Sequence, residues 1–368
     1  MSASALRDDA ARAFLAESGW GAAQLEKLPG DASTRHYTRL RMNGRTAMLM
    51  DQPQHAEGGS APPTATPEER RALGYNATAR LAGVDCRRFI AASEYLRKSG
   101  LAAPEILAAD AKTGFLIIED LGDDLYTDII AKGADELGLY EAAIDALVRL
   151  HAAPAPASLA PALPLFAYDD TALLAETDLL TEWFMPAALG RAVRADEAAE
   201  HRALWRAALR EVNTGASVFV HRDFHAQNLL WRGRHQGLAR VGVIDFQDAV
   251  AGSTAYDLIS LLEDARRDVA PQLAHAMTAR YLASSGTGNK ADFHASAALF
   301  AAQRNAKIIG IFARLAKRDA KPRYLAFLPR VWRYMEGDLA HPALEPLKAW
   351  YDRAIPKRLR TIAERTPA

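Results

Sequence analysis

The sequence has little of what marks membrane-bound, secreted or nucleic-acid-binding proteins. Its 368 residues include one cysteine, Cys86, which excludes an internal disulfide and favours a reducing compartment. No apolar run approaches the length of a membrane span, and 45 Lys and Arg residues balance 45 Asp and Glu residues. Residues 1–20 carry charges throughout and lack the apolar core of a signal peptide. We therefore expect a cytoplasmic protein with neither a membrane nor a nucleic-acid partner.

What is present is an ordinary globular composition, 49% hydrophobic and 24% charged, and a length that suggests about two domains. The dipeptide Asn43-Gly44 between two strand-like runs is a strong hairpin signal. Asp85 and Gly100 are placed to begin and end a helix. The elements expected in this part of the chain are helices at 5–17 and 85–99 and strands at 35–42, 46–50 and 114–120.

Residues 51–80 interrupt this pattern. The segment is dense in Gly, Pro, Ser and Thr and has no apolar periodicity. We expect a flexible surface insert here, which is compatible with both a plain insertion and a lid over a substrate.

Beyond residue 120 the sequence predicts mainly helix, including helices at 257–268, 270–284, 292–316 and 342–364. Short strand-like runs at 217–220, 229–231 and 240–244 interrupt the helices. We therefore predict an α+β fold, with a small antiparallel β-sheet N-lobe over residues 1–120 and a larger, mainly helical C-lobe over residues 121–368.

The most informative segment reads HRDFHAQN at residues 221–228 and is followed by the strand-terminal Asp245. If 229–231 and 240–244 pair as an antiparallel hairpin, Asp245 lies beside Asn228, and Asp223 precedes the hairpin. Carboxylate and amide oxygens suit Mg²⁺, and a further aspartate can accept a hydroxyl proton. The spacing H-R-D-x-x-x-x-N matches a kinase catalytic loop at every specified position.

On these residues the chain resembles the aminoglycoside phosphotransferase superfamily, the small-molecule branch of the bilobal protein-kinase-like fold. Several stretches are most similar to the bacterial N-acetylmuramate/N-acetylglucosamine anomeric kinases of cell-wall recycling. These stretches are residues 30–40, 104–107, 119–122, 221–228, 243–248, 303–305 and 311–315. The resemblance implies an ATP-dependent sugar kinase that uses Mg²⁺.

The resemblance also implies roles for individual residues. Asp223 would be the catalytic base and contact the acceptor, while Asn228 and Asp245 would bind Mg²⁺. A hinge and a turn would bind the nucleotide, through Glu119, Asp120 and Leu121 at adenine and Ser33, Thr34 and Arg35 at the phosphates. Asp257 would brace the catalytic loop or cap the helix that begins beside it.

One departure from the family concerns the strand at 46–50. The family carries a lysine there, paired with a glutamate on the next helix, whereas this strand reads TAMLM. Arg35 or Arg45 could replace that lysine, or Mg²⁺ and backbone amides could suffice. Glu94 lies on the predicted helix without its usual partner.

Arg304 is the predicted acceptor-binding residue. An arginine beside apolar residues could turn inward and contact the lactyl carboxylate of N-acetylmuramate. Aminoglycoside, choline or homoserine acceptors remain alternatives, and Glu263, Asp264 and Asp268 could form an acidic groove for an aminoglycoside. A metal-dependent hydrolase built on the His/Asp cluster and an inactive kinase-like binding module are the competing classes. No feature of the sequence indicates an oligomeric state.

Overall fold

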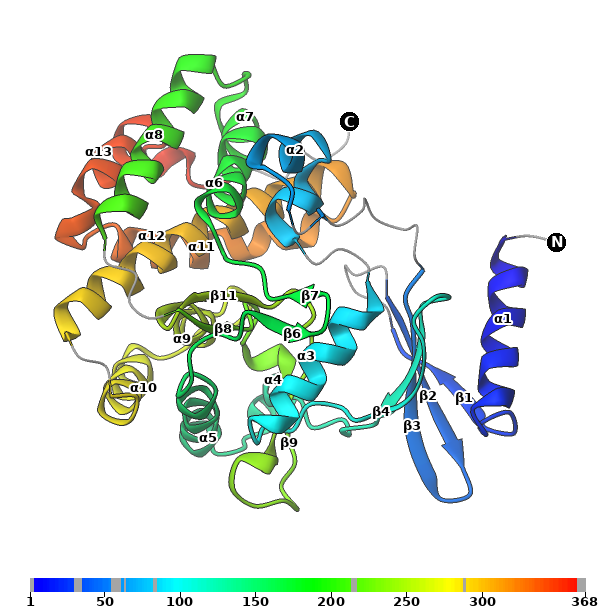
Figure 1. The fold of residues 1–368 in the computed structure, drawn as a ribbon. Coiled ribbons are helices and arrows are strands. Elements are labelled where there is room, and N and C mark those ends of the chain that lie inside the picture. Colours follow the sequence, from blue (N-terminus) through cyan, green and yellow to red (C-terminus); the bar gives the residue numbers. More distant parts are fainter. Residues whose placement is uncertain are drawn as a thin grey trace. The chain divides into compact units, whose positions relative to one another are not determined.

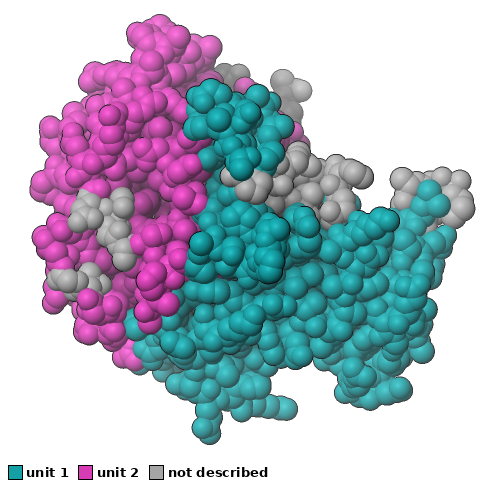
Figure 2. Space-filling view, in the orientation of Figure 1, with its two compact units in different colours: residues 1–150, 156–166, 227–249 teal, residues 151–155, 167–226, 250–368 magenta. Residues whose placement is uncertain are grey.

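A computed structural model describes residues 3–29, 35–53, 61–62, 64–81, 85–212, 217–286 and 289–362. The chain divides into two compact units, coloured separately in Figure 2. Unit 1 comprises residues 1–150, 156–166 and 227–249, and unit 2 comprises residues 151–155, 167–226 and 250–368. Neither unit coincides with the ranges 1–120 and 121–368, and the functional division into lobes at residue 120 stays a prediction.

Unit 1 is built on an antiparallel five-stranded sheet in the order β1-β2-β3-β5-β4 (Figure 1). The predicted hairpin is confirmed, because Met42 pairs with Arg45 and both turn residues, Asn43 and Gly44, have positive φ. Phe14 of helix α1 packs against this sheet, where its ring stacks on the ring of Phe115. The strands are β1 (Gln24–Lys27), β2 (His36–Met42), β3 (Arg45–Asp51), β4 (Ile106–Asp110) and β5 (Phe115–Glu119).

Helix α3 of unit 1 begins and ends at the residues that the sequence indicated. The Asp85 side chain accepts the N–H of Arg87 and begins α3, and Gly100, with φ 91°, follows its end. The helices are α1 (Ala3–Glu17), α2 (Pro67–Ala72), a π-helical turn η1 (Asn76–Arg80), α3 (Cys86–Lys98), α4 (Tyr126–Ala131), α5 (Glu136–Leu150) and the 3-10 turn η4 (Gly237–Arg240). A small ribbon pairs β6 (Ser158–Ala160) with β7 (Leu163–Pro164).

The described part of residues 51–80 contains regular and partly buried elements that the sequence analysis did not predict, whereas the flexibility of the segment stays a prediction. Thr66 and Glu69 form a reciprocal capping box that begins α2, and the following π-helical turn buries Ala77, Thr78 and Ala79. The capping box is visible in the sequence, but the buried residues are small and give no hydrophobic period. Residues 54–60 and 63 lie outside the described residues.

The predicted second hairpin is also present in unit 1. Strand β9 (Leu229–Trp231) pairs antiparallel with β10 (Val241–Val243), and Leu229 faces Val243. The register continues one residue further, where the Ile244 N–H donates to the Asn228 carbonyl at 3.1 Å. This pairing brings Asn228 and the chain that leads into Asp245 together, as the spacing predicted.

Unit 2 is helical around the long helix α11, which packs against α6, α9 and α12. Gly310 of α11 lies against the backbone of Leu179, where a Cβ would come within 2.4 Å of a carbonyl carbon. Its helices are α6 (Asp170–Leu179), α7 (Met185–Leu189), α8 (Ala195–Glu211), α9 (Ala255–Leu262), α10 (Pro271–Ser284), α11 (Lys290–Arg318), α12 (Leu328–Asp338) and α13 (Glu345–Ala354). Shorter turns are the π-helical η2 (Leu180–Phe184) and the 3-10 turns η5 (Pro322–Phe327), η6 (Pro342–Leu344) and η7 (Lys357–Leu359).

Unit 2 corrects three sequence expectations. Strand β8 (Ser217–Val220) pairs with β11 (Val250–Ser253), whose sequence VAGS carried no strand signal. The helix expected at 257–268 ends at Leu262, because Asp264 instead accepts the N–H of Arg266 in a turn. The last helix ends at Ala354 rather than near residue 364. Within the described ranges, no helix combines the length and hydrophobicity needed to cross a membrane.

Candidate active site

The loop that carries HRD in unit 2 is fixed by one buried carboxylate. Asp257, fully buried in the first turn of α9, accepts the backbone N–H of His221 at 2.7 Å and of Arg222 at 2.9 Å. Arg222 has φ 76°, a conformation that a non-glycine residue holds only when its surroundings enforce it. Asp257 therefore braces the HRD loop and does not cap α9, which begins two residues earlier at Ala255.

Asp223 follows this braced turn and lines a pocket of about 110 Å³. Burial by itself would disfavour its negative charge, but nearby positive groups outweigh burial and hold the pKa of Asp223 well below its ordinary value. The largest of these contributions comes from Lys307, followed by His225, Arg222 and Arg304. Asp223 is therefore a carboxylate at neutral pH and can accept a hydrogen bond from a hydroxyl group.

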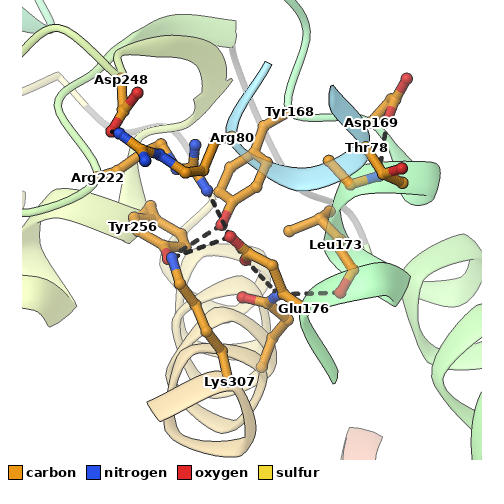
Figure 3. Close-up of polar contacts among 12 residues, drawn as sticks. Thr78, Arg80, Tyr168, Asp169, Leu173, Glu176, Arg222, Asp248, Tyr256 and Lys307 are labelled. Carbon is orange, nitrogen blue, oxygen red and sulfur yellow. Dashed lines mark hydrogen bonds and ion pairs between the residues drawn. The ribbon is translucent and has the colours of Figure 1, made fainter. Parts of the chain in front are cut away.

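Behind this loop, Glu176 of α6 is a fully buried hub (Figure 3). Its Oε1 pairs with Arg222 and lies 2.9 Å from the Lys307 ammonium. Its Oε2 accepts the Tyr168 hydroxyl and, at 3.0 Å, the Gln303 amide. Burial opposes ionisation, but the two cations lower the pKa of Glu176, and Glu176 in turn raises the pKa of Lys307 against the effect of burial. The ammonium of Lys307 is thus held by Glu176.

The pocket of unit 2 has a polar and an apolar side. Its polar lining residues are Asp223, His225, Asp264, Arg266, Arg304 and Lys307. The apolar side consists of Ala265 together with Ile308, Ile311 and Phe312 of α11. Burial lowers the pKa of His225, and the nearby carboxylates of Asp264 and Asp223 oppose that shift. Arg304 lines this pocket together with Asp223, and its contact with an acceptor stays a prediction.

Unit 1 contains the two predicted magnesium ligands. Asp245 has φ 65°, and its Oδ1 lies 2.6 Å from the Arg35 guanidinium. Arg35, 7% exposed, also donates to Gln247, which itself donates to Asp245 Oδ1 at 3.1 Å. Asn228 precedes β9 and Asp245 follows β10, and both side chains carry oxygen. Such a pair fits Mg²⁺, which takes one or two carboxylates and completes its shell with phosphate and water. The Asp223 carboxylate belongs to unit 2, so its meeting with Asn228 and Asp245 stays a prediction.

The predicted hinge, residues 119–121, lies at the end of strand β5. Two of its side chains form ion pairs with arginines. Glu119 pairs with Arg232 at 2.8 Å, and the Arg39 guanidinium pairs with Asp120 at 2.8 Å. Leu121 follows without a charged side chain. The predicted phosphate residues Ser33 and Thr34 lie outside the described residues.

The strand β3 carries no lysine, and the structure limits what could replace it. Arg45 lies with its guanidinium carbon 5.0 Å from the centre of the Trp20 ring, on the α1 side of unit 1. Glu94 pairs with Lys98 at 3.6 Å on the exposed face of α3. Arg35 is the candidate that contacts a predicted site residue, through its pair with Asp245.

Sequence reasoning missed Glu176, Arg266 and the pairing of Lys307 with Glu176, and it considered Asp264 only as part of an acidic groove for an aminoglycoside. Glu176 gave no signal because its helix, ALLAET, reads as an ordinary surface helix with acidic positions. Asp264 and Arg266 were assigned to a helix that ends before them. The spacing of Arg304 and Lys307 on one helical face was the usable signal.

Fold and site together define a class of enzyme that transfers phosphoryl groups to small molecules. The family model for the phosphotransferase enzyme family matches residues 24–299. The chain therefore belongs to the phosphotransferase enzyme family. A curated N-acetylmuramate/N-acetylglucosamine kinase from Caulobacter vibrioides is 46% identical over 363 residues, covering 98% of this chain and 100% of the relative. A protein of the same name from Pseudomonas aeruginosa is 34% identical, covering 89% of this chain and 88% of the relative.

Solved structures extend the likeness to the fold. The structure of a microcompartment-associated aminopropanol kinase has a TM-score of 0.58 and 16% identity, covering 90% of this chain and 98% of that chain. The α+β, protein-kinase-like fold predicted from the sequence is thereby confirmed.

Proposed function

We propose that this chain is an ATP-dependent kinase that phosphorylates the anomeric hydroxyl of N-acetylmuramate and N-acetylglucosamine in the cytoplasm. The observation that carries the proposal is Asp223 on a braced HRD loop, at the wall of a pocket with both charged and apolar sides. The names of two relatives that match most of the chain, both N-acetylmuramate/N-acetylglucosamine kinases, support the choice of acceptor.

In this proposal Asp223 accepts the proton of the anomeric hydroxyl as its oxygen bonds to the γ-phosphorus of ATP. The bond from the γ-phosphorus to the bridging oxygen breaks, and ADP and the sugar 1-phosphate leave. A carboxylate with a lowered pKa is a weak base. An anomeric hydroxyl is more acidic than an ordinary alcohol, so a weak base that also orients the hydroxyl is adequate.

On the nucleotide side, Asn228 and Asp245 would hold Mg²⁺, which would supply positive charge to the phosphates when bound. We assign the phosphate contact of the missing strand lysine to Arg35, whose guanidinium is already beside Asp245. Ser33 and Thr34 would add hydroxyl donors. The side chains of Glu119 and Asp120 are engaged by arginines, so adenine would meet the backbone of the 119–121 hinge.

The charges near the pocket disfavour an aminoglycoside or choline, which are cationic. Of the three acids considered for an acidic groove, Asp268 is paired with Arg330 and Arg333, and Glu263 bonds to the Asn305 amide. Asp264 alone of the three lines the pocket, together with three basic side chains. Such a lining suits a neutral or anionic acceptor.

A metal-dependent hydrolase has less support. Among the residues that the structure describes, no group of three or more His, Cys, Asp or Glu side chains is placed to hold a metal ion. His221, a member of the cluster that suggested this alternative, uses Nδ1 to accept the Asp223 N–H at 3.3 Å.

The proposal is tested by incubating the full chain with ATP, Mg²⁺ and a panel of acceptors. The panel contains N-acetylmuramate, N-acetylglucosamine, glucose, choline and kanamycin, and phosphorus NMR locates the phosphate. We expect anomeric phosphates from both amino sugars. The methyl glycoside of N-acetylglucosamine, whose anomeric oxygen is blocked, is the matched control and should give no product. Product from choline or kanamycin, with none from either amino sugar, would contradict the proposal.

A further inference from the structure

The pocket beside Asp223 contains polar groups that the protein leaves without a partner. Asp264 is 1% exposed, and its Oδ1 accepts the Arg266 N–H at 2.8 Å. Its Oδ2 is buried and has no hydrogen-bond partner among the described residues. A buried carboxylate oxygen without a partner is costly, so a ligand that donates a hydrogen bond there would be bound favourably.

The three cations that line the pocket differ in how much of their charge is available. The Lys307 ammonium lies 2.9 Å from the Glu176 carboxylate and is balanced by it. Arg304 is buried and gives one N–H to the Glu263 carbonyl at 3.1 Å, of the five that a guanidinium carries. Arg266 is half-buried, and within the described ranges no side-chain acceptor bonds its guanidinium. Arg266 and Arg304 are therefore the groups able to bind an anionic substituent.

The neighbouring backbone explains how Arg266 is presented. Helix α9 ends at Leu262, and the turn made by Asp264 directs residues 264–266 along the pocket instead of continuing the helix. An arginine at this place offers a planar fork of donors that matches a carboxylate. Ile308 and Phe312 on α11 give the same pocket an apolar wall suited to a methyl group.

We propose that Arg266, with Arg304, forms a subsite for the carboxylate of the acceptor, and that Asp264 accepts a hydrogen bond from a hydroxyl or amide shared by carboxylate-bearing and neutral acceptors. This inference rests on the proposed function. N-acetylmuramate differs from N-acetylglucosamine by its lactyl ether, which carries one carboxylate and one methyl group. The subsite therefore selects N-acetylmuramate over N-acetylglucosamine, while Asp264 serves both sugars.

The test compares the two sugars on the same variants of the full chain. Arg266→Ala should lower kcat/KM for N-acetylmuramate about 10- to 100-fold, through KM, because it removes a charge-assisted hydrogen bond. The same variant should change kcat/KM for N-acetylglucosamine less than about twofold, because that sugar has no carboxylate. Asp264→Asn should lower kcat/KM for both sugars by a similar factor.

Arg353→Ala is the matched control, because Arg353 makes an exposed ion pair with Glu200 outside the pocket. It should leave both sugars unaffected. Equal losses for both sugars in Arg266→Ala, or no loss for either, would overturn the inference while leaving the kinase proposal intact.

Calorimetry keeps the inference testable even if neither sugar is phosphorylated, a result that would remove the proposed function. N-acetylmuramate is titrated into the wild-type chain and into Arg266→Ala. Binding to the wild type that weakens about tenfold or more in the variant supports the subsite. No measurable binding to the wild type, or equal binding to both proteins, overturns it.

Discussion

The two units differ in how their buried cations are paired with carboxylates. In unit 1, the arginines near the predicted nucleotide residues are matched by carboxylates, as in Arg35 with Asp245 and Arg39 with Asp120. In unit 2, Glu176 is matched against two cations, Arg222 and Lys307, and positive charge is left facing Asp223. A triphosphate would have to compete for arginines that already have partners, whereas Arg222 and Lys307, near the proposed acceptor pocket, are held in advance by Glu176.

This difference suggests where preorganisation lies in the molecule. Buried, hydrogen-bonded charges hold their geometry, and removing one partner leaves the other uncompensated. Pairs with a partly exposed member, such as Arg35 with Asp245, can exchange partners at lower cost. We therefore expect substitutions in unit 2 to affect the chemical step and the folding free energy, and substitutions in unit 1 to affect mainly nucleotide binding.

The largest effect is expected from Asp223→Asn. The amide keeps the size of the side chain but cannot accept the hydroxyl proton, so kcat for the preferred amino sugar should fall about 10²- to 10⁴-fold. Steady-state kinetics with a coupled ADP assay measures the loss. The KM for ATP should stay close to wild type, whereas the urea midpoint should fall, because the buried cations around Asp223 lose part of their compensating charge. Unchanged turnover would instead favour an inactive, kinase-like binding module contaminated by another kinase.

Glu176→Gln is expected to have the next largest effect. It leaves Arg222 and Lys307 buried without their carboxylate, which should lower the free energy of unfolding by about 3–5 kcal/mol. Urea denaturation followed by circular dichroism measures it. The matched control is Glu26→Gln, which breaks the exposed pair with Arg41 on the sheet of unit 1 and should cost no more than about 1 kcal/mol. Similar losses in the two variants would contradict the contrast between the units.

The sequence was sufficient where local signals and spacing determine the structure. The Asn43-Gly44 hairpin, the Asp85 cap and the β9–β10 pairing were all predicted, because turn chemistry and alternation act over a few residues. The HRD motif located the loop of Asp223. The family match then confirmed the fold and the class of enzyme.

The rest could not be predicted because it depends on contacts between distant segments. Glu176 and Lys307 are 131 positions apart, and neither is unusual in its own helix. Strand β11 forms through its pairing with β8, although VAGS has weak strand propensity. The early end of α9, which presents Asp264 and Arg266 to the pocket, depends on one side-chain hydrogen bond.

A smaller effect is expected from Arg35→Gln, which tests the nucleotide side. If Arg35 contacts the phosphates, losing one charge-assisted bond should raise KM for ATP about tenfold or more, with little change in kcat. Titration of ADP and Mg²⁺ by calorimetry should show a parallel loss of affinity. The exposed Arg41→Gln is the control and should change neither value. A fall in kcat without a change in nucleotide affinity would assign Arg35 to the transition state rather than to binding.

The smallest expected effect compares one glycine from each unit. Gly44 has φ 74° in the hairpin turn of unit 1, and a Cβ there would meet nothing within 4 Å. Gly44→Ala should therefore lower the free energy of unfolding by about 1 kcal/mol through backbone strain alone. Gly337 in α12 of unit 2 has equally open surroundings and no positive φ. Gly337→Ala should raise the free energy of unfolding by up to about 1 kcal/mol, because alanine favours helix.

Urea denaturation of both variants measures the two changes. The substitution and the available space are the same at both positions, so changes in unfolding free energy of opposite sign would be due to backbone conformation. Changes of equal sign would contradict the left-handed turn at Gly44.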